Sequence, residues 1–330
     1  MAELIDLKEL EERVLLIAVN AGEEKETKAS LDELEELAQT AGAVPVARVI
    51  QNREAVHPGT YLGKGKLLEV REFLARTGAT GVICDDELSP AQLRNLEDVL
   101  ETKVMDRTMV ILDIFASRAH TREGKIQVEL AQLRYRAIRL VGMRNSLSRL
   151  GGGIGTRGPG EKKLETDRRL IHQRIGQLKR ELEDVKRHRE VTRQHREKNY
   201  GLTAAIVGYT NAGKSTLLNK LTGAGILAEN RLFATLDPTT RAFDLADGQQ
   251  ILMTDTVGFI RKLPHHLIDA FKSTLEEARY SDVILHVVDC SNPQMDMQMY
   301  VVKETLRELG IVDKTCLLYT SDAADDSLRV

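Results

Sequence analysis

Gly208-Tyr-Thr-Asn-Ala-Gly-Lys-Ser215 decides the fold of this chain, because it fits the pattern G-x-x-x-x-G-K-[ST] of a phosphate-binding loop. An apolar run at 204–207 precedes it and a helix-like segment at 216–221 follows it, which is the order strand, loop, helix that such a loop needs. A glycine turn beside a solvated lysine would give the same letters without these flanking elements. The stretch therefore predicts an α/β domain that holds a triphosphate.

Each residue type in this loop has a physical reason to be there. Gly208 and Gly213 leave backbone N–H groups free to cradle phosphate oxygens, and the helix that follows adds the positive end of its dipole. Lys214 is expected to reach the β- and γ-phosphates, and the Ser215 hydroxyl to bind Mg²⁺. The predicted contacts of the loop with nucleotide are Gly208, Tyr209, Thr210, Asn211, Ala212, Gly213, Lys214, Ser215 and Thr216.

Two later stretches complete the pattern. Ile251-Leu-Met-Thr-Asp255-Thr-Val-Gly258 predicts a buried strand that ends in Asp-x-x-Gly, where Asp255 can hold a Mg²⁺ water and the Gly258 N–H can reach the γ-phosphate. Between the motifs, the segment 233–241 carries several hydroxyls, one of which could complete the metal shell only while the γ-phosphate is present. Asp-x-x-Gly alone is a weak signal, but the three stretches in this order are a strong one.

These motifs resemble the HflX family of ribosome-associated, translation-factor-related GTPases. The resemblance covers about residues 1–315 and rests on GYTNAGKST at 208–216, FATLDPTTR at 233–241, DTVGFIRKLPHHLIDAFKSTLEE at 255–277 and GGGIGTRGPGEKKLETDRR at 151–169. It implies that Thr235 binds Mg²⁺ beside Ser215. It also implies that the nucleotide is lined by Phe233, Ala234, Thr235, Leu236 and Asp237, and by Asp255, Thr256, Val257 and Gly258. The predicted catalytic residues are Lys214, Thr235, Asp255 and Gly258.

Two positions bear on how GTP would be hydrolysed. Phe259 follows Asp-x-x-Gly, where many regulatory GTPases carry a glutamine that orients the attacking water, so slow intrinsic hydrolysis is expected. Asn211 occupies the position at which some GTPases coordinate K⁺, a charge that would stabilise the transition state. Asparagine is also a good turn former, so a K⁺ role and a purely conformational role both stay open.

The composition is that of a globular protein. The chain has 330 residues, of which 42% are hydrophobic and 29% charged, so it allows two to three domains and excludes wholesale disorder. The sequence contains no apolar run long enough to cross a bilayer. Its three cysteines are scattered and odd in number, which suits a reducing cytoplasm and does not indicate a disulfide framework or a metal site. A net charge of −3 gives no general attraction to nucleic acid, so any such contact needs a local patch and DNA is not an expected partner.

Residues 1–118 predict an N-terminal α/β domain. Strands are expected at 14–19, 44–49, 80–84 and around Val104, alternating with a helix capped by Ser30 and helices at 67–77 and 90–100, which indicates a largely parallel sheet. Tyr61-Leu-Gly-Lys-Gly-Lys66 lacks the P-loop frame. A second phosphate site, an RNA-facing basic loop and a plain turn all remain open for it.

Residues 119–200 predict an antiparallel helical hairpin. Apolar side chains recur at helical spacing in two stretches, and the second has the alternating steps of a coiled coil; the positions are Ile126, Leu130, Leu133, Ala137, Leu140 and Val141, then Leu164, Ile171, Ile175, Leu178, Leu182 and Val185. A glycine-rich tip at 150–161 would join them, with Arg157, Lys162 and Lys163 nearby, and a basic linker helix at 188–200 would follow. The seam could close within one chain or between two, and a monomer is expected. The tip is either a flexible turn or a contact to an anionic partner, and the resemblance favours ribosomal RNA of the large subunit.

The P-loop domain is expected over 201–315. A hairpin about Asp247-Gly248 should join strands 241–245 and 249–254, followed by a buried strand at 282–289 and a helix at 297–309. A further strand that ends in Asn-Lys-x-Asp, which would read guanine, does not follow. Residues 316–325 resemble the translation of a sequencing adapter, so we expect a truncated domain and a non-native tail at 316–330. Guanine specificity is implied by the resemblance alone.

The sequence as a whole therefore predicts an α/β protein with an N-terminal α/β domain, a helical hairpin and an incomplete P-loop GTPase domain. By resemblance it would bind GTP or GDP and Mg²⁺ in the cytoplasm, hydrolyse GTP, associate with the large ribosomal subunit, and split or rescue stalled ribosomes. Two alternatives stay open: an ATP-using RNA remodeller, and a non-enzymatic scaffold that binds ribosomes without a base pocket.

Overall fold

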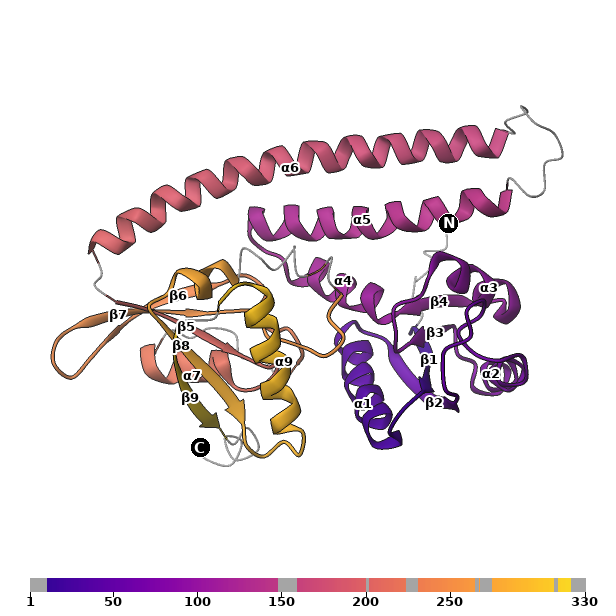
Figure 1. Ribbon diagram of the computed structural model, residues 1–330, viewed down its shortest axis with the longest axis horizontal. Coiled ribbons are helices and arrows are strands. Elements are labelled where there is room, and N and C mark those ends of the chain that lie inside the picture. Colours follow the sequence, from indigo (N-terminus) through magenta and orange to yellow (C-terminus); the bar gives the residue numbers. More distant parts are fainter. Residues whose placement is uncertain are drawn as a thin grey trace, which may run out of the picture. The chain divides into compact units, whose positions relative to one another are not determined.

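The computed structural model of the chain is shown in Figure 1, and it describes residues 11–147, 159–199, 202–223, 231–264, 267, 275–311 and 314–321. The chain packs into two compact units. One comprises Met1–Ile114 with Ile138–Glu161, and the other Phe115–Ala137 with Lys162–Val330. Among the helices in the described ranges, none is long and apolar enough to cross a membrane.

The first unit contains a four-stranded parallel sheet in the order β2-β1-β3-β4, which confirms the predicted architecture. Every residue of β1 from 14 to 19 is buried, as expected for a strand that is covered on both faces. Leu15, Ile17 and Val19 of β1 share a core with apolar side chains of α2 and α3. The elements are β1 (Arg13–Asn20), α1 (Glu24–Thr40), β2 (Val44–Asn52), α2 (Lys64–Thr77), β3 (Gly81–Cys84), α3 (Pro90–Leu100) and β4 (Lys103–Asp106).

The predicted start of the first helix was wrong. α1 begins at Glu24 with Glu23 as its N-cap residue, and Glu24 and Glu26 in the first turn favour the positive end of the helix dipole. Ser30 therefore lies inside the helix, where it is buried and its hydroxyl donates to Asp85 Oδ2 at 2.8 Å. The Tyr61–Lys66 stretch leads into α2, and the N–H of its N-cap residue Gly63 donates to Gln51 Oε1 at 2.8 Å.

Three helices follow β4: α4 (Arg107–Arg118), α5 (Arg122–Leu147) and α6 (Pro159–Asn199). α4 was not predicted, and the basic stretch after residue 188 continues α6 instead of forming a separate linker helix.

Within the second unit, the start of α5 pairs with α6 through a cluster of Ile126, Leu130, Ile175 and Leu178. The ion pairs Glu129–Arg174 and Glu123–Arg189 set an antiparallel direction, as predicted for the hairpin. Arg157 and most of the predicted tip lie outside the described residues, and so do the side chains of Lys162 and Lys163.

The second unit also contains a five-stranded sheet in the order β6-β7-β5-β8-β9, in which only β6 runs antiparallel to its neighbour (Figure 1). The predicted hairpin joins β6 and β7, with Gly248 at φ +83°. P-loop strand β5 lies between β7 and β8, so the carboxyl ends of these parallel strands meet at one edge of the sheet. The elements are β5 (Leu202–Gly208), α7 (Lys214–Thr222), β6 (Thr239–Asp244), β7 (Gln250–Asp255), β8 (Val283–Asp289), α9 (Met295–Glu308) and β9 (Thr315–Ser321).

The expectation that no strand follows α9 was wrong. Residues 315–321 form β9, which pairs in parallel with β8 from Thr315 opposite Val283 to Ser321 opposite Asp289. The run Thr-Cys-Leu-Leu-Tyr-Thr is rich in β-branched, aromatic and apolar residues, and it satisfies the backbone groups on the open side of β8. The predicted boundary at 315/316 therefore falls inside a strand. The non-native origin of residues 316–330 stays a prediction.

Candidate functional site

The P-loop lies at the carboxyl end of β5, and glycine is needed at two of its positions for different physical reasons. A Cβ on Gly208 would lie 2.3 Å from the Val287 carbonyl oxygen, so glycine here lets β5 approach β8 closely. Gly213 is the N-cap residue of α7 and has φ +87°, a conformation that favours glycine. Asn211 also lies in the left-handed region, at φ +62°, which asparagine tolerates better than most residues. The loop thus places the N-terminus of α7 at the pocket that the P-loop residues line.

Lys214 lies on the floor of this pocket. Its side chain is 6% exposed, and its Nζ donates to the Tyr209 carbonyl oxygen at 2.7 Å. A Cβ on Gly258 would lie 3.0 Å from the same Nζ, so the P-loop lysine and the glycine of Asp-x-x-Gly are neighbours, as two contacts to one phosphate would require. Burial lowers the pKa of Lys214 to about 8, and the nearby Asp255 carboxylate opposes this shift.

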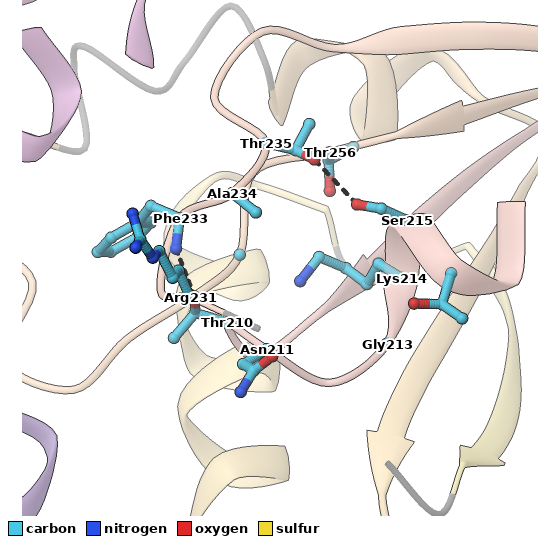
Figure 2. Close-up of a pocket in the computed structure, with 12 residues that line it drawn as sticks. Thr210, Asn211, Gly213, Lys214, Ser215, Arg231, Phe233, Ala234, Thr235 and Thr256 are labelled. Atoms are coloured by element: carbon cyan, nitrogen blue, oxygen red, sulfur yellow. Dashed lines mark hydrogen bonds between the residues drawn. The ribbon is translucent and has the colours of Figure 1, made fainter. Parts of the chain in front are cut away.

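Three oxygen-bearing side chains converge beside Lys214. The Ser215 hydroxyl lies 2.7 Å from Asp255 Oδ2. It also lies 2.9 Å from Thr235 Oγ1 (Figure 2). Asp255 is fully buried, burial raises its pKa, and the Lys214 ammonium opposes that rise. In the part of the chain that the structure describes, Asp255 Oδ1 has no hydrogen-bond partner. Two hydroxyls and a buried carboxylate with an unused oxygen are the hard ligands that Mg²⁺ prefers, so this set fits the predicted metal.

A pocket opens beside these groups, and most of the predicted contacts line it (Figure 2). Arg231 also lines the pocket, and it was missed because it precedes the recognised FATLDPTTR stretch by two positions. An arginine just before a segment that is expected to border phosphate was the signal that could have identified it. The lining residues are Thr210, Asn211, Gly213, Lys214, Ser215, Thr216, Arg231, Phe233, Ala234, Thr235, Thr256 and Gly258.

The other predicted contacts lie around the pocket and do not line it. Gly208 and Asp255 support it from the strands, while Tyr209, Ala212, Val257 and Leu236 are buried in packing. Asp237 turns away, and its carboxylate accepts hydrogen bonds from residues 120 and 121. Phe259 is buried and is joined to the P-loop through backbone hydrogen bonds with Gly208 and Thr210. Its apolar ring has no group that could orient a water.

The strand order, the P-loop and the Asp-x-x-Gly turn beside it define a P-loop GTPase. Three family models match in succession: "GTP-binding GTPase N-terminal" over residues 28–116, "GTP-binding GTPase Middle Region" over 118–196 and "50S ribosome-binding GTPase" over 203–320. GTPase HflX of Lacrimispora saccharolytica is 77% identical over 98% of this chain and 77% of its own length. GTPase HflX of Escherichia coli is 47% identical over 96% of this chain and 74% of its own length. The chain belongs to the HflX family of GTPases.

A solved structure extends this likeness to the arrangement of the chain. It is titled "crystal structure of SsGBP and GDP complex", has a TM-score of 0.52 and 27% sequence identity, and covers 93% of this chain and 81% of its own. The predicted family, the α/β fold class and the GTPase activity are thereby confirmed.

Proposed function

We propose that the pocket binds GTP with its triphosphate along the P-loop and with Mg²⁺ held by Ser215 and Thr235, while Asp255 holds the metal through water. The observation that carries this proposal is the convergence of these three side chains next to Lys214. When bound, Mg²⁺ would neutralise charge on the β- and γ-phosphates. Asn211 borders the same pocket, and we propose it as the ligand of an additional K⁺.

The chain's own groups then perform three tasks. Lys214, with a pKa of about 8, is largely protonated at neutral pH and supplies positive charge where negative charge develops on the transferred phosphoryl group. The N–H groups at the start of α7 would cradle the phosphates, and Gly258, which lies beside Lys214, would offer its N–H to the γ-phosphate. Because Phe259 is buried and apolar, orienting the water falls to another group, and intrinsic turnover should be slow.

Nucleotide binding to the Lys214→Ala variant tests this site. The change removes the buried ammonium, so we expect GTP affinity to fall by at least about tenfold and Mg²⁺-dependent hydrolysis to be lost. Titration of fluorescent GTP with GTP and ATP as competitors also separates the GTPase from an ATP-using remodeller. Lys220→Ala, at the far end of α7, is the matched control and should bind as the unmodified chain does. Unchanged GTP affinity in Lys214→Ala would contradict the proposed site.

We further propose that this GTPase acts in the cytoplasm, as a monomer, on the large ribosomal subunit, and that it separates stalled or idle ribosomes. The description of the family model over 203–320 as a 50S ribosome-binding GTPase supports the partner. Cosedimentation with 50S subunits in a non-hydrolysable GTP analogue and in GDP tests it, since a nucleotide-controlled factor should bind more tightly with the analogue. Binding that Lys214→Ala leaves unchanged would favour the non-enzymatic scaffold instead.

A further inference from the structure

The segment that carries Thr235 is held at its start by a residue far away in the sequence. The Phe233 ring packs edge to face on the Phe115 ring of α4, with centroids 4.8 Å apart and planes at 83°, and both rings are 1% exposed. Phe233 has φ +54°, an uncommon conformation for an aromatic residue, and its N–H donates to Thr210 Oγ1 at 2.9 Å. The start of the segment is therefore fixed by tertiary contacts.

Its other end is bound to residues 120–124, which we call the α5 start. The Asp237 carboxylate accepts hydrogen bonds from the His120 N–H at 2.8 Å, the Thr121 N–H at 2.9 Å and the Thr121 hydroxyl at 2.5 Å. A carboxylate here satisfies N–H groups that precede α5 and favours the positive end of the helix dipole. A Cβ on Gly124 would lie 2.4 Å from Asp237 Oδ1, so this approach requires glycine at 124.

Thr235 lies between these two anchors, two residues from each. Its hydroxyl is 2.9 Å from Ser215 Oγ, so the anchors set its position at the proposed metal shell. The α5 start is also linked to the segment that follows Asp-x-x-Gly, because Glu123 pairs with Arg189 of α6 at 3.0 Å and Arg189 pairs with Glu276. The α5 start is thus bonded directly to Asp237 and, through Arg189 of α6, to Glu276.

We propose that Asp237 is a positioning residue that binds the α5 start, holds Thr235 at the metal shell, and thereby couples the nucleotide state to the helical pair α5–α6. This inference rests on the proposed role of Thr235. A nucleotide that engages Thr235 stabilises the hydrogen bonds between Asp237 and the α5 start. A nucleotide that does not engage Thr235 allows these hydrogen bonds to break. Because coupling between two sites is reciprocal, a partner that shifts α5 changes the affinity for GTP by the same factor.

The Gly124→Ala and Asp237→Ala variants of the full chain test the coupling by two independent routes. The first pushes the carboxylate away with its charge intact, and the second removes it. In both, we expect the preference for a non-hydrolysable GTP analogue over GDP to fall by about tenfold, and the Mg²⁺ concentration for half-maximal analogue binding to rise. GDP affinity should not change in Gly124→Ala. Fluorescent-nucleotide titrations over a range of Mg²⁺ concentrations measure all three quantities.

Gly176→Ala is the matched control, because Gly176 lies in α6 with no heavy atom within 4 Å of an added Cβ, and its preference should equal that of the unmodified chain. Asp237→Asn keeps an oxygen acceptor, so its preference for the analogue over GDP should lie between those of the unmodified chain and Asp237→Ala. An unmodified chain that binds analogue and GDP equally would overturn the proposed site itself. A normal preference in the unmodified chain that persists in both variants would overturn the inference alone.

Hydrogen exchange gives a direct readout of the anchor. In the unmodified chain, the analogue should slow amide exchange at residues 120–121 relative to GDP, because Asp237 accepts from these amides. In Gly124→Ala this difference should disappear. Equal exchange in both nucleotide states of the unmodified chain would show that the anchor does not respond to nucleotide and would overturn the coupling.

Discussion

His286 is a titratable side chain within the P-loop sheet. It lies in β8, only 2% exposed, and burial lowers its pKa to about 4, with the positive charges of Lys303 and Lys214 adding to the shift. The imidazole is therefore neutral in the folded protein at neutral pH. In the unfolded chain it would titrate near its ordinary value of about 6.5, so protons bind preferentially to the unfolded state between these two values.

We predict that this residue makes the P-loop unit less stable in mild acid. The stabilisation is fully present above about pH 6.5 and is lost as the pH falls towards about 4, so lowering the pH from about 7 to about 5 should cost up to about 2 kcal/mol of unfolding free energy. Urea unfolding at the two pH values measures the difference. His286→Gln, which cannot titrate, should show a smaller loss, and an equal loss in both proteins would contradict this assignment.

At the residue scale, the predicted positions agree with the structure where a local motif sets the spacing, and differ from it where distant neighbours decide. Lys214, Ser215 and Asp255 were found from spacing alone, and the structure brings them together. The family resemblance implied that Asp237 lines the nucleotide, yet its hydrogen-bond partners are more than a hundred positions away in the chain. No local pattern encodes such a contact, since it depends on how α5 packs.

At the scale of elements, the close approach of β5 and β8 supports the P-loop. Gly208 lies opposite Val287 in the parallel ladder, and an added Cβ would lie 2.3 Å from its carbonyl oxygen. We predict that Gly208→Ala forces the strands apart, lowers the unfolding free energy by about 2–4 kcal/mol and weakens nucleotide binding. Chemical denaturation and GTP titration measure the two effects.

The same glycine-to-alanine change at Gly176 should raise the unfolding free energy instead of lowering it. Gly176 lies inside α6 with space around it, so alanine should stabilise the helix by about 0.5–1 kcal/mol. If Gly208→Ala unfolded no more easily than the unmodified protein, the close strand approach would not be the reason for glycine at this position.

Helices and strands were predicted mainly from the spacing of apolar residues, and the errors lie in segments where that spacing gives no signal. The parallel N-terminal sheet and the α5–α6 pair carry strong apolar patterns and were found, and the β6–β7 hairpin was found from its Asp247-Gly248 turn. α1 begins earlier than its apolar stripe, because a first turn of charged residues is helical without facing the core. β9 was missed because the expected strand was defined by a guanine-reading motif, whereas a strand needs only suitable side chains and a neighbouring strand with free backbone groups.

At the scale of the whole molecule, the nucleotide pocket and part of the helical pair belong to the same compact unit. The second unit contains the nucleotide pocket together with the start of α5 and most of α6, so the GTPase site and the base of the helical pair share one unit. The tip of that pair, at 150–161, carries the predicted contact to ribosomal RNA. Along the chain, the predicted tip lies between α5 and α6, and the start of α5 belongs to the unit that contains the pocket.

We predict that the combined change Arg157→Ala, Lys162→Ala and Lys163→Ala weakens binding to 50S subunits and leaves nucleotide binding intact. Each lost phosphate contact reduces the release of counterions, so the steepness with which affinity falls with salt should decrease by about one for each such contact. Sedimentation with 50S subunits over a range of KCl concentrations, with the GTP analogue bound, measures both the affinity and its salt dependence.

A second triple variant separates a specific contact from general charge. Lys179→Ala, Arg180→Ala and Arg187→Ala remove the same net charge from exposed positions of α6 away from the tip. If the tip reads ribosomal RNA, this variant should keep most of its affinity and salt dependence, since long-range attraction between exposed charges is screened beyond about 10 Å at moderate salt. Equal losses in both variants would indicate that basic charge along α6 attracts the ribosome without a dedicated site, and an unaffected tip variant would remove the tip from the interface.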